Sequence, residues 1–72
     1  MRVTGKMIRK LRDRLKITQA ELAELMDVSA QSVYQWEHKD GSIRMRMPTR
    51  AALQRVRNMG VREIRVELDQ QS

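Results

Sequence analysis

Residues 17–37 of the chain read ITQAELAELMDVSAQSVYQWE, and this stretch decides the fold. Thr18 is placed to cap a helix, and Glu21 three residues later completes the sequence signature of a capping box. Apolar residues at helical spacing follow, so we expect a helix over 19–26. Asp27 then stands where the chain must turn, and aspartate tolerates the left-handed backbone conformation better than most residues.

A second short helix follows the turn, capped by Ser29 and running over about 30–38. Val33 and Trp36 form its inward side. Two short helices joined by a tight turn are typical of a helix-turn-helix, whose second helix enters the DNA major groove. The polar side chains that point elsewhere are of the types that read base edges: Gln31, Ser32 and Gln35.

The rest of the chain predicts more helix. Residues 1–4 form an extended lead-in whose Thr4 caps a helix over about 5–16. After a turn and an irregular segment over 39–47, Pro48 suits the first position of a helix that continues to Asn58. Gly60 is expected to cap that helix at its C-terminal end. We therefore expect an all-α bundle of four or five helices in one domain, residues 1–72, with a reader unit over about 18–38.

The segment 61–68 fits two descriptions. Val61, Ile64 and Leu68 recur at helical spacing, whereas Ile64, Val66 and Leu68 alternate with charged residues as in an edge strand; we favour the helix. One small bundle cannot bury all of these side chains, and exposed apolar patches usually mark interaction sites. We therefore predict a homodimer interface made by Val61, Ile64, Val66 and Leu68.

Composition limits the partners. The net charge is +6 and there is no cysteine or phenylalanine. A basic domain without aromatic stacking platforms favours duplex nucleic acid over single strands, although a merely solvated basic surface explains the charge about as well. No apolar run is long enough for a membrane helix and no signal peptide is recognisable, which favours a cytoplasmic protein.

Residues 11–37 resemble the lambda-repressor-like helix-turn-helix domains, the Cro/cI or XRE family. The matching residues are Leu11, Arg12, Leu15, Thr18, Gln19, Glu21, Leu22, Ala23, Val28, Ser29, Val33, Trp36 and Glu37. The resemblance implies a bundle of four or five helices that binds DNA, commonly as a dimeric repressor of a phage, prophage or bacterium. Asp27 replaces the glycine usual in the turn, and the loop over 39–47 is richer in Arg and Met than usual.

The resemblance also assigns roles to residues. The base-reading positions are Ala30, Gln31, Ser32 and Gln35, because glutamine bonds adenine in bidentate fashion and alanine can contact a thymine methyl. The resemblance gives Gln19 a phosphate contact. Further phosphate-contacting candidates are Arg44, Arg46 and Arg50, because arginine pairs with phosphate in fork geometry, although a solvated charged loop is the alternative. Tyr34 fits either a phosphate contact or a half-buried position at the rim. The structural residues are Trp36 in the core and an ion pair of Arg12 with Glu37.

No constellation supports catalysis. His38 has no second metal ligand or nucleophile at a useful spacing, and the carboxylates form no acid–base pair, so we expect no metal, cofactor or small-molecule ligand. The sequence predicts a reader domain that is the whole protein and represses transcription as a dimer on a palindromic operator. The alternative is an antitoxin-like module that binds a protein through Met45, Met47, Val61 and Ile64.

Overall fold

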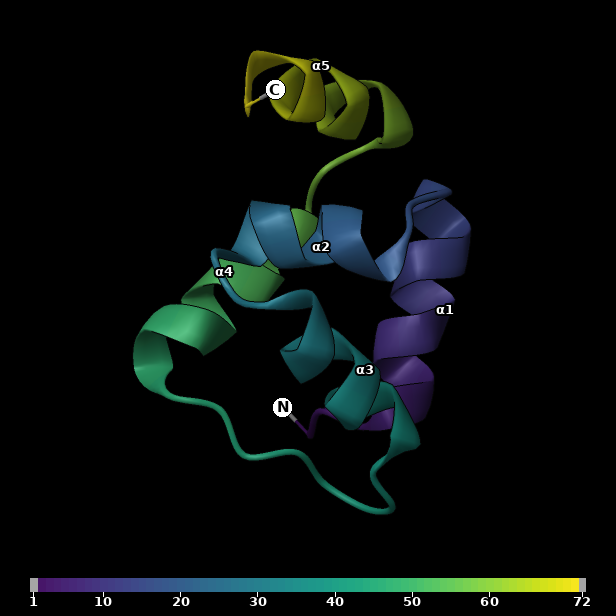
Figure 1. The fold of residues 1–72 in the computed structure, drawn as a ribbon, viewed down its shortest axis with the longest axis vertical. Helices are drawn as coiled ribbons and strands as arrows, with labels where there is room; N and C mark the ends of the chain where they lie inside the picture. Colours follow the sequence, from purple (N-terminus) through teal and green to yellow (C-terminus); the bar gives the residue numbers. More distant parts are fainter. Residues whose placement is uncertain (1, 72) are drawn as a thin grey trace.

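A computed structural model describes residues 2–71, and within them every regular element is a helix (Figure 1). The expectation of an all-α bundle is therefore confirmed, with 61–68 helical rather than extended. The helices are α1 (Gly5–Leu15), α2 (Gln19–Met26), α3 (Ala30–His38), α4 (Met47–Arg57) and α5 (Val61–Gln71). No helix among the described residues is long and apolar enough to cross a membrane.

The predicted N-terminal caps are present on the first three helices. The Thr4 hydroxyl accepts from the Met7 amide, and Ser29 accepts from the Ser32 amide. The Thr18–Glu21 capping box is complete, so α2 begins where the sequence places it. Asp27 is left-handed with a φ of 58°, as expected for the turn.

Two helix ends differ from what the sequence predicts. Lys16 caps α1 in the left-handed conformation, with a φ of 57°, although no glycine or asparagine marks this position in the sequence. The prediction for Gly60 is wrong: a right-handed Asn58 caps the C-terminal end of α4, and Gly60 instead lies immediately before α5. Its carbonyl accepts from the Ile64 amide at 3.0 Å and its amide donates to Glu63 Oε1 at 3.2 Å. The glycine therefore serves the start of the next helix.

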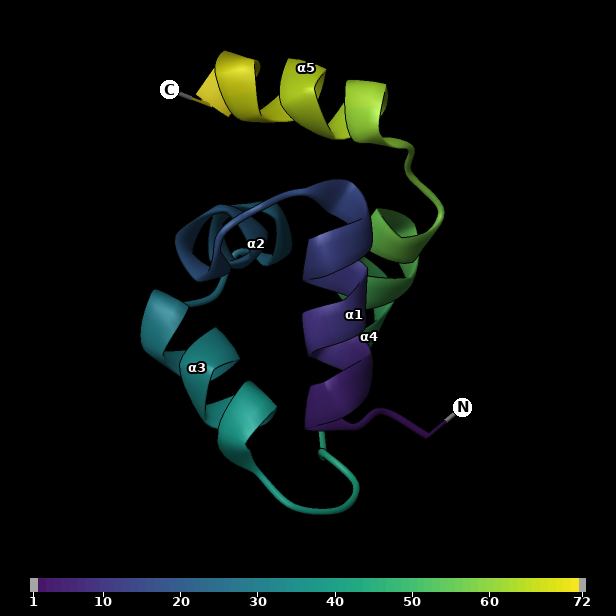
Figure 2. The same cartoon turned by 90° about the vertical axis from the view of Figure 1, so that its right-hand side faces the viewer.

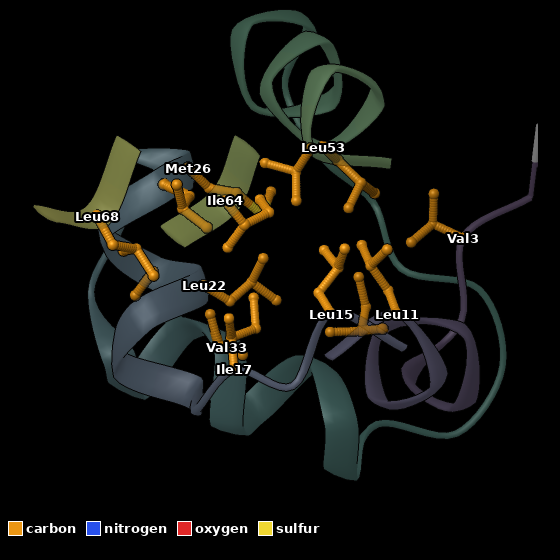
Figure 3. Close-up of a cluster of buried hydrophobic side chains, with 14 of the residues drawn as sticks. Val3, Leu11, Leu15, Ile17, Leu22, Met26, Val33, Leu53, Ile64 and Leu68 are labelled. Atoms are coloured by element: carbon orange, nitrogen blue, oxygen red, sulfur yellow. The ribbon is translucent and has the colours of Figure 1, made fainter. Parts of the chain in front are cut away.

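The core lies between the helices and draws on all five of them (Figure 3). Figures 1 and 2 show α5 lying across the outer side of α2. Ile64 is fully buried and Leu68 is 7 % exposed, so the prediction that these two side chains form a dimer interface is corrected. Ile64 and Leu68 pack into the core of the same chain, because α5 covers the outer side of α2. Val61 and Val66 remain exposed.

Two arginines fasten α5 to α2. Arg65 donates to the Glu21 carboxylate and to the carbonyl of Lys16, near the start of α2. Arg55 of α4 donates to the Leu25 carbonyl at 2.8 Å, near the end of α2, and to the carboxylate of Glu67 in α5. Both contacts join residues distant in sequence, so they fix the position of α5 on the helix-turn-helix.

Candidate nucleic-acid interface

The outer face of α3 carries the predicted base-reading residues. Ala30, Gln31 and Gln35 are exposed, and neither glutamine side chain bonds to another described residue. Ser32 differs because it is half-buried and its hydroxyl lies 3.0 Å from that of Ser29, within the helix cap. The structure therefore leaves the two glutamine amides open to a ligand and ties the serine into local structure.

A buried carboxylate fixes the orientation of α3. The side chain of Glu37 is 1 % exposed, and Arg12 of α1 grips it through Nε and through Nη2, the latter at 2.9 Å. Gln19 of α2 donates to the same carboxylate at 3.2 Å. Arg12 lowers the pKa of Glu37 below its usual value, and the hydrogen bond from Gln19 acts in the same direction.

This arrangement connects three helices through one residue. The ion pair of Arg12 with Glu37 that the resemblance implied is present, and the guanidinium also bonds to the carbonyl of Ile17. Gln19 lies in the first turn of α2, where helix N–H groups favour an anion. Its amide is thus a brace between α2 and α3, and a phosphate contact there stays a prediction.

Cations are unevenly distributed around α3. Residues 17–38 contain no lysine or arginine, and they contain four carboxylates: Glu21, Glu24, Asp27 and Glu37. Arg44 and Arg46 follow in the loop, and Arg50 lies in the first half of α4; all three are exposed. Among the described residues, the side chains of Arg44 and Arg46 have no hydrogen bond or ion pair. Any pairing of a Lys or Arg side chain with phosphate at this surface therefore depends on segments that flank residues 17–38.

Tyr34 and His38 form a pair that sequence reasoning missed. Tyr34 is 51 % exposed, and its ring stacks on that of His38 with centroids 4.1 Å apart. The His38 Nδ1 lies 2.9 Å from the Tyr34 carbonyl. The spacing of four residues on one helix was the signal available for this contact. Trp36, assigned to the core, is half-buried and packs against the buried cluster.

The arrangement suits the binding of nucleic acid. Within residues 2–71 no three His, Cys, Asp or Glu side chains are grouped as a metal site requires. What the surface offers is a rigid helix with two free amides, beside a loop with two free guanidinium groups. These are the groups that recognise base edges and phosphates.

The comparisons agree with this geometry. A family model for helix-turn-helix proteins matches residues 8–47, more than half of the chain, from the first turns of α1 to the first residue of α4. Neither the curated proteins nor the solved structures gave a significant match. The matched region contains both helices of the motif and the whole brace around Glu37. The chain belongs to the lambda-repressor-like (XRE-type) helix-turn-helix family of DNA-binding transcription regulators.

Proposed function

We propose that the protein is a transcriptional repressor that binds a short inverted-repeat operator as a two-fold pair. One observation carries the proposal: the two free amides of Gln31 and Gln35 stand on a helix that Arg12 and Gln19 hold through the buried Glu37. A preorganised reading helix of this kind is what sequence discrimination requires.

The spacing of the two glutamines suits base pairs that lie about two steps apart. Four residues of α-helix advance about 6 Å. Successive base pairs of B-DNA are about 3.4 Å apart, so Gln31 and Gln35 reach positions about two pairs apart when α3 lies along the groove. Each bidentate glutamine–adenine contact discriminates by about 1–3 kcal/mol. Ala30 at the start of α3 suits a thymine methyl group, and Ser32 contributes less because its hydroxyl is already bonded.

The second copy is proposed to dock on the outer side of α5. A groove there is lined by Met59, Arg62, Glu63, Val66, Glu67 and Gln70. A symmetric pair reuses this surface on both copies, with Val66 against Val66. Because Ile64 and Leu68 are buried, Val61 and Val66 are the large hydrophobic side chains that stay exposed on the described part of α5, which is little for a stable interface of roughly 800 Å² per partner. The pair therefore forms on the operator, where the DNA holds both copies in place.

The antitoxin alternative loses support. It needs a continuous apolar surface of Met45, Met47, Val61 and Ile64. Ile64 is fully buried and Met45 is half-buried, which leaves Met47, at 82 % exposed, apart from Val61 at the start of α5. Repression by occupying DNA needs no such surface, because a bound pair blocks polymerase sterically.

The test begins with selection of binding sites from a pool of random duplexes. We expect an enriched inverted repeat whose half-sites lie about 10–10.5 base pairs apart between centres. Sedimentation should show a monomer without DNA, and binding to the whole operator should be cooperative. Failure to enrich any sequence would refute the proposal.

A substitution on α5 tests the pairing surface. Val66→Asp should abolish cooperativity on the whole operator and leave half-site affinity unchanged, because α5 lies on the opposite side of α2 from α3 (Figure 2). Gln54→Asp on α4 adds the same charge at another exposed position and serves as the control. Equal cooperativity in the two variants would move the pairing surface away from α5.

A further inference from the structure

The loop between α3 and α4, residues 39–46, carries the free guanidinium groups of Arg44 and Arg46. Since residues 17–38 supply no cation, these two side chains are the first arginines after the reading helix. A flexible loop would spread them over many positions, and each phosphate contact would then cost conformational entropy. The position of this loop therefore matters for binding.

The N-terminal segment Arg2–Gly5 fastens that loop. The amide of Ile43 donates to the carbonyl of Val3 at 2.7 Å, and Thr4 and Ser42 form an antiparallel bridge. The Nε of Arg2 donates to the Ser42 hydroxyl at 2.6 Å. Figure 2 shows the loop passing beneath the N-terminal end of α1, where these contacts lie.

Burial anchors both sides of this junction. Val3 is 3 % exposed and Ile43 is 7 % exposed, and both belong to the core. Gly5 packs so closely on the end of α3 that an added Cβ would lie 2.3 Å from the Trp36 carbonyl oxygen. The segment is therefore held against α3 on one side and holds the loop on the other.

We propose that residues 2–5 are a positioning segment for DNA binding. They hold the loop so that Arg44 and Arg46 meet the phosphates of the same duplex whose bases α3 reads. They act through the two arginines and not by touching bases. The inference rests on the proposed function, since it concerns how the same surface engages DNA.

The test uses a variant that leaves the net charge unchanged. Val3→Ala combined with Ser42→Ala removes the apolar anchor and the acceptor for Arg2. Each phosphate contact contributes about 0.9 to the slope of log affinity against log salt concentration. We expect this double variant to have a slope shallower by about 0.9–1.8 while its base preference is retained. Val56→Ala, at another fully buried valine, controls for lost stability and should keep the wild-type slope.

A second measurement asks whether the effect passes through the arginines. In a chain already carrying Arg44→Ala and Arg46→Ala, the Val3→Ala and Ser42→Ala changes should alter the slope no further. Hydrogen exchange at the Ile43 amide, measured without DNA, should accelerate in the Val3→Ala, Ser42→Ala variant and not in Val56→Ala.

Each outcome has a distinct meaning. A folded Val3→Ala, Ser42→Ala variant with the wild-type slope, or a Val56→Ala variant with the same loss, would overturn the positioning role. A further slope change in the arginine-free background would overturn it as well. If the wild-type chain itself shows no salt-dependent binding to duplex DNA, the proposed function fails instead.

Discussion

Gly5→Ala should destabilise the protein more than any other glycine-to-alanine change in a helix start of this chain. The new Cβ would lie 2.3 Å from the carbonyl oxygen of Trp36 and 2.9 Å from that of Glu37. Both neighbours are backbone atoms, so no side-chain rotation relieves the overlap. Restoring a normal contact near 3.5 Å requires α1 and α3 to separate by about 1 Å.

The magnitude follows from comparable overpacking. Such insertions typically cost about 1–3 kcal/mol, and the better helix propensity of alanine returns about 0.5–1 kcal/mol. We expect a net loss of about 1 kcal/mol, which lowers the melting temperature of a domain this size by about 4–8 °C. The shift should also loosen the Arg12–Glu37 pair, because both contacts join the same two helices.

Gly60→Ala is the matched control for this measurement. Its Cβ would meet only Glu63 Oε1, at 3.7 Å, and the residue immediately precedes α5, whereas Gly5 is the first residue of α1. Alanine makes the unfolded chain less flexible, which stabilises the fold, and is a poorer N-terminal cap than glycine, which destabilises it. The free energy of unfolding should therefore change by no more than about 0.5 kcal/mol. Thermal unfolding followed by far-UV circular dichroism compares the two. Equal melting temperatures would refute the close approach of α1 to α3.

Three further predictions concern the helix-turn-helix and the ion pair that supports it. Gln31→Ala and Gln35→Ala should each relax base preference by about 1–3 kcal/mol at an unchanged melting temperature, and unchanged selectivity would contradict the reading role. Arg12→Ala should cost more stability than Glu37→Ala, at most about 3–5 kcal/mol, because it leaves the buried carboxylate with only Gln19 and the more distant Arg9 as partners. The double variant should lose less than the sum of the two, and a strictly additive cycle would argue against a direct pair. Because the pKa values of Glu37 and Glu21 are lowered from 4.5, their stabilisation is present above that pH and is lost as the pH falls through the folded-state values. Glu37→Gln should therefore flatten the acid limb of a stability–pH curve.

Local chemistry explains what the sequence predicted well. The caps at Thr4, Thr18 and Ser29 and the left-handed Asp27 depend on residues within one turn of each other. Short sequence patterns contain all the residues of such a cap, so the starts of α1, α2 and α3 were predicted correctly.

Long-range packing explains what it missed. The burial of Ile64 depends on how α5 crosses α2, and the anchors Arg55 and Arg65 join segments more than ten residues apart. The bridge between Thr4 and Ser42 likewise has no signature in either segment. The extended conformation predicted for residues 1–4 is confirmed at Thr4, and residue 1 lies outside the described residues. The contact of this segment with the loop became visible only in the fold.

The charge distribution also limits how far the reading unit can be transplanted. Residues 17–38 contain four carboxylates and no lysine or arginine, so an excised unit would have a net charge of −4 with His38 neutral. A helix pair of that charge is repelled by the polyanion whose bases it is shaped to read. Grafting α2 and α3 onto another scaffold would carry over the specificity determinants without the attraction. A design that grafts α2 and α3 onto another scaffold must therefore include lysine or arginine side chains of that scaffold, at the places that α1, the loop and α4 occupy here.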